Sequence, residues 1–483
     1  MTENLVKTRF APSPTGDMHL GNLRTALFNA LHAARGGGAF LLRIEDTDAE
    51  RSRAVFLDGL LRDLRWVGLQ WNAGPETTAA GGPWLQSERM DIYTRYYDQL
   101  AAAQRTYPCF CSDVQLKLER KAQLAAGQPP RYSGTCARLS ASEIERRLAG
   151  GLRPTLRFRV GDSGTVVFED LVRGTQRFER ADIGDFILRR SDGSPAFFFS
   201  NAIDDALMGV THVLRGEDHL ANTPRQLMLL EALGLDAPAY GHLALLVGPD
   251  GSPLSKRHGS RSVRELRAQG YLPAALLNYL ARLGHACDSD ALLEFSDLAQ
   301  AFSIARLGRA PARFDQAQLD HWQKLAVQRV ERTQFVAWVE DAVGAELEPW
   351  VTPELFDEFV DAVRENVLFP RDLLDWAPRL FARLPVLSAD ASNVIRSAGA
   401  GFFGIALEEV IRGTDGFKSF AQAVGGRAGV KGKSLFMPLR AALTGLEHGP
   451  EMNRIWQLLG DERRGARLEA ALRLCESEND AHA

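Results

Sequence analysis

Residues 9–22 read RFAPSPTGDMHLGN and continue directly into LRTALFNALHAAR. The first letters predict a short strand, the prolines and glycine predict a rigid loop, and apolar residues then recur at helical spacing from Leu23 to Leu31. Backbone N–H groups at such a helix start, together with the positive end of the helix dipole, can hold phosphates. His19 can donate a hydrogen bond to a phosphate oxygen, and Gly21 lets the backbone or a base approach closely. The stretch therefore predicts a phosphate site between the first strand and the first helix.

The alternation of strand and helix continues through the first 110 residues. Residues 36–48 (GGGAFLLRIEDTD) predict a turn and a buried strand that ends in acidic residues, and residues 52–68 again show helical spacing. This order predicts a parallel sheet, which binds its ligands at the carboxyl ends of the strands.

The pattern changes twice further along the chain. Residues 109–190 combine a cysteine-containing hairpin, a polar helix and short strands, which predicts an inserted α+β module. The signals of the sheet resume near residue 197, and helical spacing dominates from about residue 330. We therefore expect an α/β fold followed by all-α domains. The predicted divisions are 1–108 and 191–245 for the two halves of the sheet domain, 109–190 for the insertion, 246–328 for a connecting domain with a basic loop, and 329–390 and 391–483 for two helical domains.

The composition is that of a cytoplasmic enzyme of several domains. Of the 483 residues, 45% are hydrophobic and 24% are charged, and no apolar run approaches the ~20 residues of a membrane-spanning helix. The N-terminus lacks the apolar stretch of a secretory signal, and five cysteines in so long a chain do not indicate a disulfide framework. The net charge of −4 argues against a generally basic protein that coats nucleic acid, but it leaves a local basic face open.

A second candidate phosphate element lies at residues 248–259, GPDGSPLSKRHG. A mobile basic loop of this kind can reach over a triphosphate and neutralise the charge that develops during phosphoryl or adenylyl transfer. In isolation, its KRH run is equally typical of a solvated surface loop.

Four blocks of the sequence, residues 9–31, 43–52, 211–226 and 246–284, resemble the signatures of bacterial glutamyl-tRNA synthetases. The resemblance implies a Rossmann-type class I catalytic domain, ATP with Mg²⁺ as cofactor, and a stem-contact domain over residues 246–328. HLGN resembles the HIGH motif and LSKRH resembles the KMSKS motif, although the fourth HIGH position is Asn22 rather than histidine. Carried over to this chain, the catalytic residues are His19 and Lys256. The implied ATP-binding residues are Pro12, His19, Gly21, Asn22, Ser255, Lys256 and Arg257.

A glutamate pocket needs an acid for the ammonium group and arginine forks for the carboxylates. Arg9, Glu45 and Arg215 lie at predicted strand ends, where a parallel sheet presents residues to a ligand. The resemblance implies that the two arginines bind carboxylates and that the glutamate binds the ammonium group. The full predicted glutamate-binding set is Arg9, Ala11, Ser13, Glu45, Phe197, Asn201, Asp205 and Arg215. Phe197 departs from the family, which usually has tyrosine at this position, so another donor or water would have to replace the phenol.

Three cysteines, Cys109, Cys111 and Cys136, cluster in the predicted insertion. With a fourth ligand they could form a tetrahedral zinc site, although scattered cysteines are often simply small hydrophobic residues. Their spacing resembles a zinc-binding pattern of some family members, which adds Tyr132 as the fourth ligand. We interpret Cys287 and Cys475 as structural.

Residues 429–445 mix basic residues with Phe436, Met437 and Pro438 and resemble the family's anticodon-binding region. Lys431, Lys433 and Arg440 are the candidate tRNA contacts, because lysine and arginine bind phosphates and unstacked bases can lie on apolar surfaces. A helical C-terminal region distinguishes the chain from glutaminyl-tRNA synthetases, which have β-barrels there. Its presence also distinguishes the chain from the short glutamyl-queuosine tRNA synthetases, which lack this region.

The resemblance implies a monomeric glutamate–tRNA ligase with no membrane association. Such an enzyme forms glutamyl-adenylate and pyrophosphate from L-glutamate and ATP and transfers glutamate to the 3′ end of tRNA(Glu). Catalysis is expected from positioning and charge stabilisation rather than from a covalent nucleophile. Two alternatives remain open at this point. One is an enzyme that charges tRNA(Gln), or both tRNAs, with glutamate; the other is a nucleotidyl-transfer enzyme or an RNA-binding paralogue on the same fold.

Overall fold

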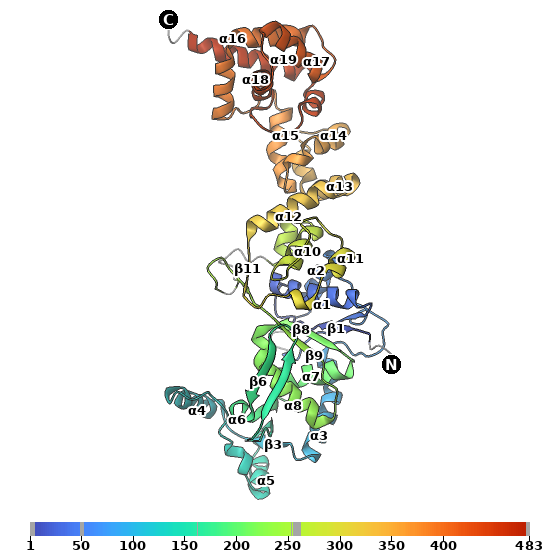
Figure 1. The fold of residues 1–483 in the computed structure, drawn as a ribbon, viewed down its shortest axis with the longest axis vertical. Coiled ribbons are helices and arrows are strands. Elements are labelled where there is room, and N and C mark those ends of the chain that lie inside the picture. The colour runs from blue at the N-terminus through green and yellow to red at the C-terminus, as the bar shows by residue number, and fades with distance from the viewer. Residues whose placement is uncertain (1–4, 49–52, 162, 253, 255–261, 480–483) are drawn as a thin grey trace. The chain divides into compact units, whose positions relative to one another are not determined.

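The computed structural model describes residues 5–48, 53–161, 163–252, 254 and 262–479 (Figure 1). Contacts divide the chain into two compact units. The first comprises Met1–Leu266 and Leu276–Leu319, and the second comprises Arg267–Ala275 and Asp320–Ala483. No helix among the described residues is long and apolar enough to cross a membrane.

The first unit is built on the predicted parallel sheet, whose strand order is β2-β1-β8-β9. Its strands are β1 (Lys7–Phe10), β2 (Ala39–Leu42), β8 (His212–Gly216) and β9 (Ala239–Leu243). The helices that accompany them are α1 (Leu20–Arg35), α2 (Ala54–Trp66), α3 (Met90–Ala102), α7 (Phe197–Leu207) and α8 (Thr223–Leu233). The inner strands are almost wholly buried, as expected of a parallel sheet covered on both faces.

Antiparallel strands and short helices separate α3 from α7, which agrees with the predicted α+β insertion. Strands β3 (Thr106–Cys109), β4 (Thr155–Phe158) and β7 (Phe186–Arg189) form one sheet, and β5 (Thr165–Asp170) pairs with β6 (Gly174–Glu179) in a hairpin. The helices of this part are α4 (Asp113–Ala125), α5 (Ala141–Ala149) and α6 (Arg180–Ile183). The hairpin is joined to the parallel sheet, because the backbone N–H of Leu171 donates to the Tyr240 carbonyl at 2.8 Å.

After β9 the chain forms a smaller parallel pair, β10 (Leu246–Val247) with β11 (Ala312–Arg313). The helices that follow β10 are α9 (Val263–Gln269), α10 (Pro273–Arg282), α11 (Phe295–Ala301) and α12 (Gln316–Arg329).

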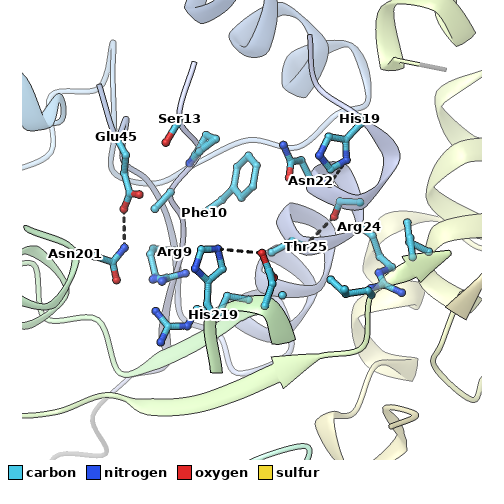
Figure 2. Close-up of a pocket in the computed structure, with 18 of the residues that line it drawn as sticks. Arg9, Phe10, Ser13, His19, Asn22, Arg24, Thr25, Glu45, Asn201 and His219 are labelled. Atoms are coloured by element: carbon cyan, nitrogen blue, oxygen red, sulfur yellow. Dashed lines mark hydrogen bonds and ion pairs between the residues drawn. The ribbon is translucent and has the colours of Figure 1, made fainter. Parts of the chain in front are cut away.

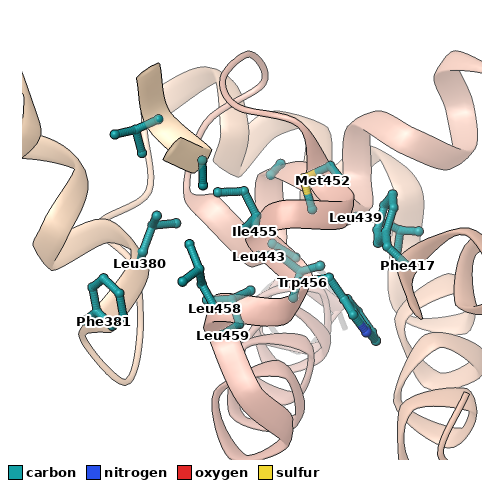
Figure 3. Packing of buried hydrophobic residues seen from close by; sticks show 14 of the residues in the cluster. Leu380, Phe381, Phe417, Leu439, Leu443, Met452, Ile455, Trp456, Leu458 and Leu459 are labelled. Carbon is teal, nitrogen blue, oxygen red and sulfur yellow. The ribbon is translucent and has the colours of Figure 1, made fainter. Parts of the chain in front are cut away.

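Among the described residues after Arg329 there are helices and no strands, as the sequence predicts. The helices are α13 (Arg332–Leu347), α14 (Pro353–Val363), α15 (Leu373–Phe381), α16 (Ala389–Ile411), α17 (Gly416–Ala428), α18 (Lys433–Thr444) and α19 (Met452–Asn479). Figure 3 shows α15, α17, α18 and α19 contributing side chains to one apolar core. Its centre is Trp456, which stacks on Phe420 with ring centroids 4.5 Å apart. Burial of these aliphatic and aromatic side chains stabilises the unit.

Candidate active site

The carboxyl ends of the parallel strands surround a cavity of about 460 Å³. Figure 2 shows Arg9, Glu45, Asn201 and His219 converging on it from different parts of the sequence. The predicted glutamate and ATP residues that line the cavity are Arg9, Ala11, Pro12, Ser13, His19, Gly21, Asn22, Glu45, Phe197, Asn201 and Arg215. Ser255, Lys256 and Arg257 lie outside the described residues, so their predicted roles remain predictions.

Arg215, at the end of β8, is held on two sides of its buried guanidinium group. Its Nε donates to His242 Nε2 at 3.1 Å, and its Nη2 donates to Thr223 Oγ1 at 2.9 Å and to Gln226 Oε1 at 2.7 Å. Its Nη1 is buried and has no hydrogen-bond partner among the described residues. Burial lowers the pKa of Arg215 to about 10, so the side chain stays charged at neutral pH. A buried cationic donor without a partner favours binding of an anionic ligand, because leaving it unpaired is costly.

Arg9, at the end of β1, forms an ion pair with the buried carboxylate of Asp205. Its Nε lies 3.2 Å from both carboxylate oxygens of Asp205, and Arg43 donates to the same carboxylate at 2.7 Å. Burial acts to raise the pKa of Asp205, but Arg9 and Arg43 lower it below its usual value, so the carboxylate is ionised. Asp205 does not line the cavity. The structure thus places this predicted glutamate contact behind Arg9, where it orients the arginine.

Glu45 supplies a negative charge on the other side of the cavity. Its Oε1 accepts from Asn201 Nδ2 at 2.6 Å and from Arg43 Nη2 at 3.2 Å. Burial raises the pKa of Glu45, and the neighbouring Arg43 and Asn201 only partly offset this effect. A cationic ligand group would therefore stabilise the ionised carboxylate further.

The acidic and basic sides of the cavity are connected by one chain of hydrogen bonds. Asn201 donates to Glu45 and accepts from Gln226 Nε2 at 2.9 Å, and Gln226 Oε1 accepts from Arg215. The orientation of both amides is therefore fixed, and with it the separation between the acid and the cation. Sequence reasoning missed Gln226 and Arg43. Gln226 is the last residue of the TPRQ sequence, within one of the blocks that resemble the family. Membership of that block was the only feature of the sequence that pointed to Gln226.

The start of α1 is arranged for an anion, as its sequence predicts. His19 is the N-cap, and its Nδ1 accepts from the Asn22 backbone N–H at 3.3 Å. Its Nε2 consequently carries the proton and can donate to a ligand. A Cβ on Gly21 would lie 3.1 Å from the His19 ring, so glycine also leaves room for that ring.

The wall beside Arg215 contains Phe197 and a residue that sequence reasoning missed, His219. Their rings stack with centroids 5.0 Å apart at 28°. His219 comes from the short helix Glu217–Asn222 and lines the cavity with Phe197. An imidazole therefore lies against the Phe197 ring in this wall of the cavity.

The three predicted metal-ligand cysteines come together. The Sγ atoms of Cys109, Cys111 and Cys136 all lie within 4.8 Å of one another. Tyr132 Oη is 3.3 Å from Cys109 Sγ and 3.4 Å from Cys111 Sγ, as expected for the fourth member. Three cysteine sulfurs in so compact a group suit a tetrahedral zinc site, and the Tyr132 oxygen lies beside them at the place of a fourth ligand.

The predicted tRNA contacts differ in exposure. Lys431 and Lys433 are exposed, and Lys433 is the first residue of α18. Arg440 is half-buried, and its Nη1 donates to the Pro450 carbonyl at 2.7 Å. Both lysines are therefore accessible to solvent, whereas Arg440 has a structural contact within its own unit.

A helix start suited to an anion beside a charged cavity, on a parallel sheet with an insertion, is the arrangement expected of a class I synthetase catalytic domain. The family described as tRNA synthetases class I (E and Q), catalytic domain, matches residues 5–321, and an anticodon-binding-domain family matches residues 334–472. Glutamate–tRNA ligase 2 of Alkalilimnicola ehrlichii is 57% identical to this chain, covering 98% of it and 99% of that protein. Glutamate–tRNA ligase 1 of Halorhodospira halophila is 54% identical, covering 99% of each.

Solved structures agree with these sequence relatives. The glutamate–tRNA ligase of Elizabethkingia meningosepticum, solved in complex with its amino acid, is 28% identical with a TM-score of 0.86, covering 97% of this chain and 99% of that one. The glutamate–tRNA synthetase of Elizabethkingia anophelis has a TM-score of 0.87 at the same identity and coverage. The chain belongs to the glutamate–tRNA ligase family.

Proposed function

We propose that this chain activates L-glutamate with ATP in the cavity at the end of β1 and β8 and transfers it to the 3′ end of tRNA(Glu). The observation that carries the proposal is the buried, unpartnered Nη1 of Arg215, held at a fixed distance from Glu45 by Asn201 and Gln226. A ligand that pairs with both ends carries an anionic group and a cationic group, and glutamate supplies these as a carboxylate and an ammonium group.

We propose one orientation of glutamate. Its ammonium group binds Glu45, and its side-chain carboxylate takes the unpartnered Nη1 of Arg215, with Arg9 as a second cation lining the same cavity. The α-carboxylate is then left facing the start of α1. Glutamine would place an amide against Arg215, which matches a cationic donor poorly and leaves the charge uncompensated.

ATP is proposed to bind with its phosphates at the start of α1. His19 Nε2–H and the backbone N–H groups of this first turn would contact the phosphates, and Gly21 keeps the approach open. Mg²⁺ bound with ATP would supply charge neutralisation on the phosphates. Lys256 is proposed to contribute a second positive charge to the phosphates.

The reaction then needs only positioning and electrostatic stabilisation. An oxygen of the α-carboxylate attacks the α-phosphorus of ATP, and pyrophosphate leaves as the bond to the α-phosphorus breaks. The terminal ribose hydroxyl of tRNA next attacks the activated carbonyl carbon, AMP leaves, and the hydroxyl proton is released.

For the rest of the chain, we propose that Lys431 and Lys433 contact tRNA phosphates in the helical unit, where both are exposed. We propose that the enzyme acts as a monomer. We propose that it acts in the cytoplasm, where tRNA and ATP are available.

Amino-acid dependence of ATP–pyrophosphate exchange in the presence of tRNA tests the proposed pocket. We expect exchange with L-glutamate and at least about a hundredfold lower kcat/KM with L-glutamine, because the amide leaves a buried cation unpaired. Equal exchange with both amino acids would contradict the orientation proposed for the side-chain carboxylate.

We also propose that Cys109, Cys111, Cys136 and Tyr132 hold a structural zinc ion, which would fix the turn after β3 against Thr135–Arg138. Elemental analysis of protein expressed with added zinc should find about one zinc per chain. Cys111→Ser should abolish retention of the metal during dialysis, whereas Cys287→Ser, outside the cluster, should retain it. Full zinc retention by Cys111→Ser, or none by the parent protein, would contradict the site.

A further inference from the structure

His242 lies between an acid and the arginine of the glutamate pocket. It belongs to β9 and is fully buried. Its Nδ1 lies 2.5 Å from Asp170 Oδ2, and its Nε2 accepts from Arg215 Nε at 3.1 Å. Neither His242 nor Asp170 lines the cavity. Nothing in the predicted catalytic or binding set uses this pair.

The hydrogen bonds allow only one protonation state for the imidazole. His242 Nε2 lies 3.1 Å from both Arg215 Nε and Thr223 Oγ1. Arg215 Nε always carries a proton, and the Thr223 hydroxyl, which already accepts from Arg215 Nη2, can donate, so Nε2 is the acceptor and the single imidazole proton lies on Nδ1, facing Asp170. Burial lowers the pKa of His242, although Asp170 opposes this effect, so the neutral form is favoured. A protonated Nε2 would place two N–H groups against each other and release Arg215 from this side.

Asp170 is itself fixed by the backbone. Its Oδ1 accepts from the N–H groups of Val172 at 3.0 Å, Arg173 at 2.8 Å and His242 at 3.2 Å. Only Oδ2 is therefore left to face the imidazole. Asp170 is the last residue of β5. The antiparallel hairpin of the insertion therefore supplies the carboxylate that contacts His242.

We propose that His242, locked in one tautomer by Asp170, is a positioning residue that aims Arg215 at the substrate carboxylate. The proposal rests on the function proposed above for Arg215. His242 holds Nε while Thr223 and Gln226 hold Nη2, so the plane of the guanidinium is fixed and Nη1 is presented to the cavity. Without an acceptor at Nε, the plane can rotate and the carboxylate loses its matched donor.

Two substitutions of His242 separate its two hydrogen bonds. The amide of His242→Asn reaches the position of Nδ1 and can donate to Asp170, but it leaves Arg215 Nε without an acceptor. The longer side chain of His242→Gln places its oxygen near the position of Nε2, where it can accept from Arg215.

A third variant, Asp170→Asn, tests the tautomer with almost no change of shape. The amide oxygen must take the place of Oδ1, because three backbone N–H groups point at it. The NH₂ group then donates to His242 Nδ1, and the imidazole proton moves to Nε2, against Arg215 Nε–H. In the serine protease triad, a change of the aspartate to asparagine likewise imposes the wrong tautomer on the histidine.

The test is the KM for glutamate in tRNA-dependent pyrophosphate exchange, which does not depend on the fraction of folded enzyme. We expect His242→Asn and Asp170→Asn to raise this KM by at least about tenfold, and His242→Gln to raise it by no more than about threefold, with the KM for ATP unchanged within about twofold. His212→Asn, on neighbouring β8 and away from the cavity, is the matched control.

Equal effects of His242→Asn and His242→Gln, or an unchanged KM in Asp170→Asn, would overturn the positioning role, as would a parallel rise in the KM for ATP. Arg215→Lys in the same assay separates this outcome from failure of the proposed function. A raised glutamate KM in Arg215→Lys with normal Asp170→Asn refutes the inference alone, whereas an unchanged KM in Arg215→Lys refutes the proposed role of the arginine.

Discussion

Arg215→Lys is expected to lower kcat/KM for glutamate by at least about thirtyfold, because truncating a desolvated, hydrogen-bonded charge costs on the order of 2–5 kcal/mol. Lysine keeps the charge but has no planar fork, so it cannot satisfy His242, Thr223 and Gln226 while also presenting a donor to the cavity. The measurement is a glutamate titration of pyrophosphate exchange with tRNA present. Most of the loss should appear as a raised KM for glutamate.

The matched control for this arginine is Arg190→Lys. Arg190 is exposed, donates to Ser194 and Pro195, and does not line the cavity. Its substitution should leave the glutamate KM unchanged. If the two lysine variants behaved alike, Arg215 would not be the carboxylate ligand.

His19→Asn is expected to lower kcat for glutamate activation by about a hundredfold, since loss of one donor to developing charge has effects of about 10²–10³. Asparagine is among the best N-cap residues, so its side chain can replace Nδ1 as the acceptor for the Asn22 N–H. It is too short to replace the Nε2–H donor. The variant therefore removes the phosphate contact and keeps the start of α1.

His19→Gln is the complementary variant, because its longer amide reaches toward the position of Nε2 but does not cap the helix well. We expect it to retain more kcat than His19→Asn and to have the lower Tm. Saturating kinetics and thermal unfolding measure the two effects separately. A normal kcat in His19→Asn would show that His19 serves only as a cap.

The parts of the fold with strong local patterns could be predicted from the sequence. The helical spacing after HLGN corresponds to α1, the two apolar segments around it correspond to β1 and β2, and the C-terminal region is helical as expected. The resemblance brought Arg9, Glu45 and Arg215 together, and the structure places all three around one cavity. These residues carry signals because each ends a strand or lies in a family motif.

The residues that orient these groups could not be predicted, because their partners are distant in the sequence. Asp170 and His242 are 72 positions apart, and each occurs in a segment that indicates only a strand. The same reason accounts for Asp205, which belonged to the predicted glutamate-binding set: its partners Arg9 and Arg43 are far from it in the sequence, and both pair with its carboxylate. Arg440 likewise has a basic side chain whose hydrogen bond to Pro450 becomes visible only in the folded chain.

Glutamylation of two purified tRNA species tests the central claim most directly. With L-glutamate, ATP and Mg²⁺, we expect the enzyme to charge the 3′ end of tRNA(Glu) and to leave tRNA(Gln) essentially uncharged, as a ligase specific for tRNA(Glu) should. Failure to charge tRNA(Glu) with glutamate would contradict the account, and comparable glutamylation of tRNA(Gln) would contradict its specificity for tRNA(Glu).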